Sequence, residues 1–285
     1  MPNQPTVAQL LIVRDRQGSR EPDTVAATLN LPPEWESSAL ALVGRFGVPP
    51  PGIRCPLAVF AQPLNRHRVV VGQVTDQPAG YPDPAQLVFR LLILDRERYE
   101  SVSDPFAIAD RFPPSWQERG SLPMLDWPSE AWPCRPVAEI QAILQNGDSP
   151  WLLGAAQALV DGGRVLWEAD KPAKEVIRGV WQLLPNRSRQ RLWPATFAFS
   201  PELPFHVLAM PGPVQPWPRG YLNPEQARDY PESSYELALQ IAAESGQQAD
   251  LDRLFARRSV DETLRLAGVL LIVMMLAAIA SKIAA

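Results

Sequence analysis

The strongest constraint on this chain is a long uncharged stretch near its carboxyl end. Leu266–Ser281 contains no Asp, Glu, Lys or Arg, and Leu270–Leu276 is an unbroken run of large apolar residues. As a helix, these 16 residues rise roughly 24 Å at about 1.5 Å per residue. That is slightly short of a bilayer core of about 30 Å, but the flanking Arg265 and Lys282 can reach toward the headgroups. A surface helix would show a polar stripe. We therefore expect residues 264–285 to be a membrane anchor that contacts lipid, rather than the buried last helix of a soluble core.

The charges around this stretch predict its orientation. Arg257, Arg258 and Arg265 precede it, and Lys282 alone follows it. Loops rich in Arg and Lys tend to remain in the cytoplasm, so we expect a single-pass, C-tail-anchored protein with a cytoplasmic N-terminal body. The short apolar run of residues 7–13 has no basic segment before it and does not resemble a secretory signal. We expect it to be a first β-strand.

Composition bounds what the body can bind. With 27 basic and 31 acidic side chains, the net charge is −4. No global basic excess points to a nucleic-acid partner. The 32 prolines are about twice the average usage, whereas the 16 glycines are not raised to match. Proline without extra glycine indicates stiff connectors between short elements.

The hydrophobic pattern predicts an α+β body of short strands and helices. Apolar, β-branched stretches before the middle of the chain suggest strands, including a hairpin over residues 56–76. Residues 86–95 fit either a strand or a short buried helix. Later segments carry helix start and stop signals, and the stop signals include Gly147 and the pair Gly162-Gly163. We divide the chain into a β-rich region, a more helical region, a Pro-rich linker, a charged juxtamembrane helix and the anchor: residues 1–130, 131–210, 211–235, 236–263 and 264–285.

A search for catalytic chemistry finds little. The only histidines are His67 and His206, and the only cysteines, Cys55 and Cys134, lie far apart. These four residues form no metal-ligand spacing, and there is no nucleophile elbow or phosphate loop. We expect no cofactor and no metal. For a hydrolase without a recognisable motif, His206 is the candidate general base, although a structural role for it is favoured.

One cluster of residues suggests a docking surface. Arg187, Arg189 and Arg191 stand at alternate positions, and Trp193 follows them. Guanidinium groups spaced in this way could bind an acidic protein partner. The alternative is a solvated turn between a helix and a strand.

The same stretch resembles a phrase found in the GTPase-associated proteins of bacterial conflict systems. In that phrase a helix leads into Leu-Leu-Pro, a basic segment and a Ser/Thr-Phe strand. The matching residues are Leu183, Leu184, Pro185, Arg189, Arg191, Leu192, Thr196 and Phe197. The resemblance covers about 20 residues, and this chain departs from it by inserting Trp193-Pro194.

The resemblance implies an adaptor or regulator near a GTPase and brings no catalytic residues to carry over. Together with the anchor, it predicts a membrane-held adaptor or scaffold that binds protein partners. The alternatives are a membrane-tethered hydrolase and a structural component of a larger membrane complex.

Overall fold

The computed structural model describes residues 6–76, 86–147 and 149–256, together with residue 274. Its strands are β1 (Thr6–Asp15), β2 (Asp23–Thr28), β3 (Ala58–Pro63), β4 (Arg68–Thr75), β5 (Gln86–Asp95), β6 (Gly120–Leu122), β7 (Leu125–Asp126), β8 (Arg164–Glu168), β9 (Pro194–Ala195), β10 (Val207–Met210) and β11 (Tyr221–Leu222). Its helices are α1 (Pro33–Gly44), α2 (Arg96–Val102), α3 (Pro105–Arg111), α4 (Val137–Leu144), α5 (Ser149–Val160), α6 (Lys174–Leu183), α7 (Asn186–Arg191), α8 (Pro224–Arg228), α9 (Ser234–Ser245) and α10 (Gln248–Phe255).

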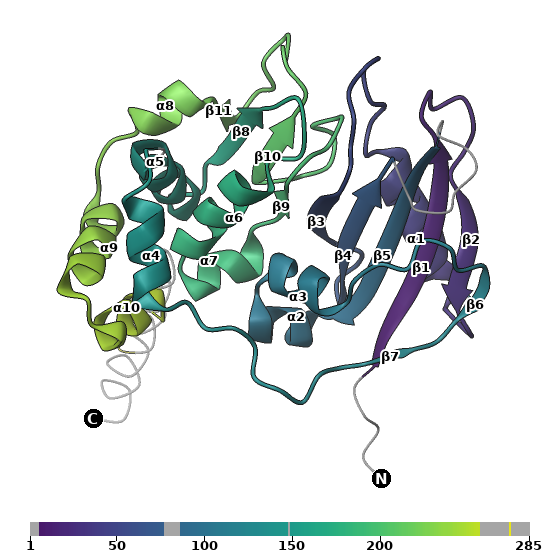
Figure 1. Cartoon of the computed structure of the whole chain (residues 1–285), viewed down its shortest axis with the longest axis horizontal. Coiled ribbons are helices and arrows are strands. Elements are labelled where there is room, and N and C mark those ends of the chain that lie inside the picture. The colour runs from purple at the N-terminus through teal and green to yellow at the C-terminus, as the bar shows by residue number, and fades with distance from the viewer. Residues whose placement is uncertain (1–5, 77–85, 148, 257–273, 275–285) are drawn as a thin grey trace, which may run out of the picture.

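These elements form a mixed α/β fold around an eleven-stranded sheet, which confirms the expected combination of short strands and helices. The strand order is β11-β8-β10-β9-β3-β4-β5-β1-β2-β6, and β7 pairs with β1. The strand-rich part occupies one end of the molecule, and α4, α5, α8, α9 and α10 gather at the other end (Figure 1).

The sheet changes character along this order. Strands β3, β4, β5, β1 and β2 are antiparallel neighbours, whereas β8 runs parallel to β10 and β11. The two parts meet where β3 pairs with β9 through Phe60 and Ala195. There Thr196 exchanges two hydrogen bonds of 2.8 Å with the backbone of Val59. One sheet and one hydrophobic core therefore continue through the region boundary expected near residue 130.

Strand β5 shows why the centre of the sheet is buried on both faces. On one face the ring of Phe89 meets that of Phe46, just after α1, at 5.2 Å. The other face carries Arg90, whose Nη1 donates to the carbonyl of Phe112, just after α3, at 2.6 Å. Strands covered on both faces are apolar without a clean alternation. This is why residues 86–95, which form a strand, also fit the pattern of a buried helix.

The segment expected to be a Pro-rich linker, residues 211–235, is part of the folded body. It contains β11, which pairs with β8, and α8, whose first turn is capped by Asn223 and Gln226 in a reciprocal capping box. Helix α8 packs closely on α5, since a Cβ at Gly154 would lie 1.8 Å from the carbonyl oxygen of Ala227. Prolines here start a helix and shape turns rather than separating two bodies.

The expected juxtamembrane helix, residues 236–263, is in its described part the pair of helices α9 and α10, which turns at Gly246 with φ 67°. Both helices pack on the body rather than standing apart from it. Among the described residues, no helix combines the length and the hydropathy that a bilayer span requires. The predicted anchor lies outside the described residues, except for residue 274.

Candidate functional site

The arginine segment predicted as a docking surface forms helix α7, and its middle arginine points into the protein. Arg189 is 4% exposed. Its Nη2 donates to Oδ2 of Asp104 at 2.6 Å, and its Nε donates to the carbonyl of Ser103 at 3.0 Å. Burial lowers the pKa of Arg189, and the neighbouring carboxylate opposes that shift. Arg189 is therefore an internal ion-pair partner and cannot contact a docked protein.

Trp193 is also internal. Its side chain is buried, and its ring stacks at a tilt on Tyr99 with 5.5 Å between centroids. Of the four docking candidates, Arg191 is exposed and Arg187 is partly exposed. The proposed docking surface thus loses two of its four residues, because α7 turns one side toward the core.

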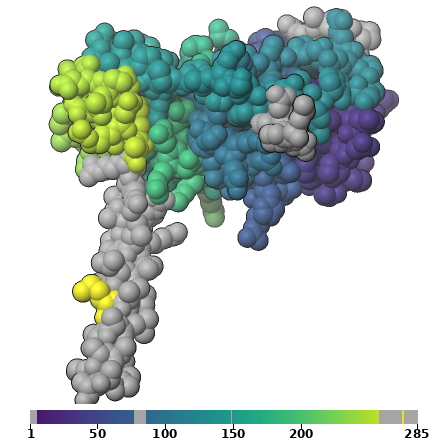
Figure 2. Space-filling view, turned by 90° about the horizontal axis from the view of Figure 1, so that it is seen from below, coloured from purple at the N-terminus to yellow at the C-terminus, as the bar shows by residue number. Residues whose placement is uncertain are grey.

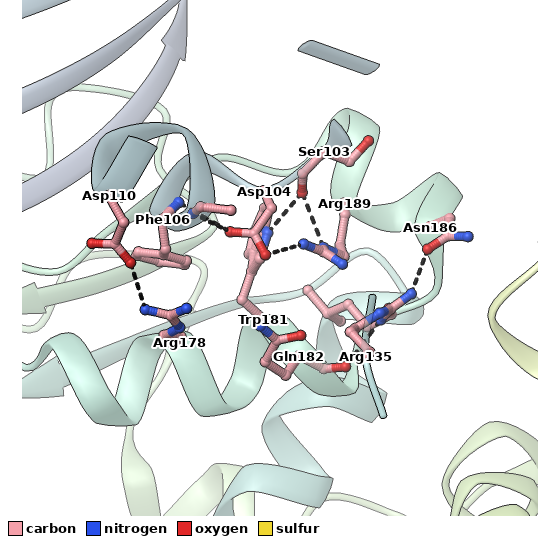
Figure 3. A network of polar contacts seen from close by, with 12 residues as sticks. Ser103, Asp104, Phe106, Asp110, Arg135, Arg178, Trp181, Gln182, Asn186 and Arg189 are labelled. Carbon is pink, nitrogen blue, oxygen red and sulfur yellow. Dashed lines mark hydrogen bonds and ion pairs between the residues drawn. The ribbon is translucent and has the colours of Figure 1, made fainter. Parts of the chain in front are cut away.

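Asp104 joins the two halves of the chain through several contacts (Figure 3). Besides pairing with Arg189, its Oδ1 accepts from the backbone N–H groups of Phe106 and Ala107 at 3.0 Å, which caps α3. The indole of Trp181, on α6, donates to the neighbouring Ser103 carbonyl at 2.9 Å. Contacts from α6 and α7 thus converge on the two residues that precede α3.

Arg135 extends this network to the last described helix. Its guanidinium donates to the carbonyls of Gln182 and Leu184 at the end of α6, and to the side chain of Asn186 (Figure 3). It also lies 3.5 Å from the ring centroid of Phe255 on α10. Burial lowers the pKa of Arg135 to about 9. Carbonyls at a helix end favour a cation, so this residue holds α6 and α10 together.

A glutamine completes the docking of α10. The side chain of Gln248 donates to the carbonyl of Arg135 at 3.0 Å and accepts from the N–H of Val137 at 2.8 Å. Nearby, Gln141 on α4 donates to the carbonyl of Ala243 on α9 at 2.7 Å. The helices just before the predicted anchor are thereby fixed to the body by buried and partly buried contacts.

His206, the candidate base of the hydrolase alternative, has its Nδ1 engaged in the fold. That nitrogen accepts a hydrogen bond from the backbone N–H of Trp193 at 3.1 Å. Burial lowers the pKa of His206 to about 4, and the charge of Arg164 acts in the same direction. The ring is thus held neutral as part of the packing between β9 and β10, and its contacts give the hydrolase hypothesis no support.

Other chemistry-bearing residues lie apart. In the part of the chain that the structure describes, no three His, Cys, Asp or Glu side chains are grouped as a metal site would require. Cys55 is a buried free thiol and Cys134 an exposed one, and burial raises the pKa of Cys55. His67 is exposed on the turn between β3 and β4.

The structure reveals a surface that the sequence patterns did not single out. A hollow of about 490 Å³ lies between α4, α5 and α9. Apolar and uncharged polar side chains line it, together with one acid: Gln141, Leu144, Gln145, Ser149, Leu153, Gln240, Ala243 and Glu244. We call it the α4–α9 groove. Beside it on α9, Leu237 and Ile241 are 50% and 58% exposed.

This helical end also has an unusual charge. Residues 137–161 and 221–255, which run to the end of α10, together contain ten Asp or Glu residues and two Arg, a net charge of −8. Because the whole chain carries −4, the remaining residues carry +4. Near the groove, burial raises the pKa of Glu236, and the neighbouring Glu232 adds to this shift. The asymmetry is countable in the sequence, but only the fold brings the two acidic segments to one end of the molecule (Figure 2).

The predicted membrane flanks Arg257, Arg258, Arg265 and Lys282 lie outside the described residues, so the structure places none of them. Comparisons with protein-family models, with curated proteins and with solved structures each found no match.

Proposed function

We propose that this protein is a scaffold held at a membrane by residues 264–285, with a body that binds protein partners on the cytoplasmic side. The observation that carries the proposal is the uncharged stretch Leu266–Ser281, which begins 11 positions after the last residue of α10, a helix fixed to the body. Arg135 and Gln248 hold α10 in place up to Phe255. The body is therefore attached to the segment without a long linker.

The short connection limits how far the body can stand from a bilayer. Seven residues, 257–263, separate Ala256 from Leu264. Even fully extended they span no more than about 25 Å. If residues 264–285 insert into a membrane, the carboxyl end of α10 lies within that distance of its surface. Arg257, Arg258 and Arg265 support a cytoplasmic position for this end.

Membrane attachment can be tested by fractionation after a carbonate wash. The intact chain should remain in the membrane pellet, and a chain lacking residues 264–285 should move to the soluble fraction. A single charge in the middle of the stretch, Leu271→Arg, costs about 3 kcal/mol on insertion scales and should also weaken retention. Leu29→Arg is the matched control, because Leu29 is an exposed residue of the body. Carbonate-resistant retention of the deleted chain would refute the anchor.

A GTPase is the partner class that the short sequence resemblance suggests. Its test should avoid Arg189, whose replacement would damage the core. We expect Arg187→Glu with Arg191→Glu to reduce co-purification of a GTP-binding protein from detergent extracts, if the exposed side of α7 is the contact. Bound nucleotide in the complex, measured by chromatography, identifies the partner as a GTPase. An unchanged complex would remove α7 from consideration as the docking site.

A further inference from the structure

We infer that the α4–α9 groove docks a basic amphipathic helix of a protein partner. The inference rests on the proposed scaffold function and deepens it by naming the surface and the chemistry of what it binds. Three properties of the described residues carry it: an exposed apolar pair on α9, the hollow beside that pair, and the negative charge of this end of the molecule.

The apolar pair lies on the outer face of α9. Leu237 and Ile241 are four residues apart and therefore neighbours on the same side of the helix. The side of α9 that packs on the body is already apolar and buried, through Leu239, Ala242 and Ala243. Helix α9 is thus apolar on two faces, of which packing within the chain uses one. Exposed large apolar side chains that lie together beside a hollow are typical of a binding surface.

The groove offers a mixed lining that suits a helix. Leu144, Leu153 and Ala243 supply apolar surface, whereas Gln145 and Gln240 supply amides that can donate and accept hydrogen bonds. Grooves of this type bind helices through apolar side chains spaced three and four residues apart. The hollow, of about 490 Å³, takes the anchoring side chains rather than the whole helix.

The negative charge of this end favours a basic helix over the two other possible occupants of the groove, a membrane surface and a second copy of the chain. Glu244 lies in the groove, and Glu139, Glu232 and Glu236 belong to the same helical end, whose two segments carry a net −8. An anionic membrane surface does not complement a groove that contains Glu244 and has Glu139 and Glu236 on the helices that form it. A second copy placed symmetrically would bring two identical negative faces together. A helix with Lys or Arg on one side and Leu on the other complements both the charge and the apolar pair.

The test uses the full chain in nanodiscs of phosphatidylcholine, a lipid without net charge. The probe is a fluorescein-labelled helical peptide of about 18 residues, with Leu on one face and Lys on the other. Binding is followed by fluorescence anisotropy. Two control peptides are used. The first has the same composition in scrambled order, and the second has Glu in place of every Lys. We expect saturable binding of the probe, and binding of both control peptides at least about tenfold weaker, or 1.4 kcal/mol.

Protein variants locate the binding site. Ile241→Ser and Glu244→Lys should each weaken binding of the probe about tenfold, because each removes part of a central contact. Their matched controls lie on the strand-rich side of the molecule: Leu29→Ser, at an apolar residue somewhat more exposed than Ile241, and Glu34→Lys, at an exposed acid on α1. Both controls should bind within about twofold of the unaltered chain. Thermal melting checks that all variants fold, and Leu237→Ser replaces Ile241→Ser if that variant does not.

Several results would overturn the inference. The first is that the scrambled peptide binds as tightly as the probe, and the second is that the control variants lose as much affinity as Ile241→Ser and Glu244→Lys. The third is self-association of the chain in sedimentation that Ile241→Ser abolishes, because a second copy would then be the occupant. Stronger binding of the body to anionic vesicles than to neutral ones through Ile241 would do the same. Carbonate fractionation of cell membranes that contain the same chain, carried out beside the binding measurement, separates the two proposals. Loss of probe binding with intact membrane retention refutes the groove alone, and the reverse refutes the anchor alone.

Discussion

An arginine is buried both at the junction, where α7 contacts the two residues that precede α3, and in the interior of the sheet. The two places accommodate the charge differently. Arg189 at the junction meets the carboxylate of Asp104 at 2.6 Å. Arg90 in β5 has only neutral acceptors among the described residues: the side-chain oxygens of Gln9 and Gln73 and the carbonyl of Phe112. Burial lowers the pKa of both side chains. The junction therefore depends on one charged pair, whereas the sheet spreads the charge over several dipoles.

Among these changes, removal of the Asp104 carboxylate should lower the unfolding free energy most. Asp104→Ala leaves Arg189 as a buried unpaired charge and removes the cap of α3. The first change costs about 3–5 kcal/mol and the second about 1 kcal/mol of unfolding free energy. Urea unfolding of the intact chain in detergent measures the loss. As a matched control, Asp110→Ala breaks the exposed contacts with Lys174 and Arg178 and should cost no more than about 1 kcal/mol.

A rescue experiment sharpens the prediction. The double variant Asp104→Leu with Arg189→Met removes both charges together and should recover much of the stability, because neither charge is left unpaired. A double variant as unstable as Asp104→Ala would mean that helix capping and packing, rather than the unpaired charge, dominate the loss.

Removing the other arginine should have a smaller effect. Arg90→Met leaves three neutral acceptors in the sheet interior without donors, and each unsatisfied group costs about 1 kcal/mol or more. We expect a total loss of about 3 kcal/mol, measured by the same urea titration. Arg90→Lys should recover less than half of it, because one ammonium cannot reach acceptors on β1, β4 and the end of α3 together. Full recovery by Lys would show that charge alone matters at this position.

The smallest effect concerns a base that the fold keeps uncharged. The folded pKa of His206 is about 4, below the usual value of about 6.5. Well above pH 6.5 the ring is neutral in both the folded and the unfolded state. As the pH falls from 6.5 toward 4, the imidazole takes up a proton mainly in the unfolded chain. The unfolding free energy therefore falls by at most about 3 kcal/mol.

The variant His206→Asn should reduce this pH dependence of the unfolding free energy, because Asn can accept from Trp193 but does not titrate. The effect is measured as the difference between variant and unaltered chain over this pH range, since carboxylates titrate there as well. If the unfolding free energies of the unaltered chain and of His206→Asn change with pH in parallel, a lowered pKa of His206 in the folded state is contradicted.

Much of the fold is local enough to be predicted from the sequence. The expected first strand and the hairpin appear as β1 and as the antiparallel pair β3 and β4. Gly147 and the pair Gly162-Gly163 follow α4 and α5, as the stop signals indicated. These features depend on residues within about ten positions of one another. Periodicity and turn chemistry therefore suffice to find them.

The candidate site could not be predicted in the same way. Arginines at alternate positions indicated an exposed edge, yet Arg189 pairs with Asp104, which lies 85 residues earlier in the chain. Prolines in residues 211–235 indicated a linker, but pairing of β11 with β8 and packing of α8 on α5 bring the segment into the fold. In both places a contact with residues far away in the sequence determines the structure, and the local sequence pattern does not reveal that contact.

By itself, the sequence determined the short elements, the charges and the uncharged stretch before the carboxyl end, because these follow from residue type and spacing. Only the tertiary structure decided which arginines are buried, where His206 is held, and that two acidic segments share one end of the molecule. It also decided that Leu237 and Ile241 stay exposed beside a groove. The reason is physical: burial and pairing depend on contacts between residues that the chain order keeps far apart.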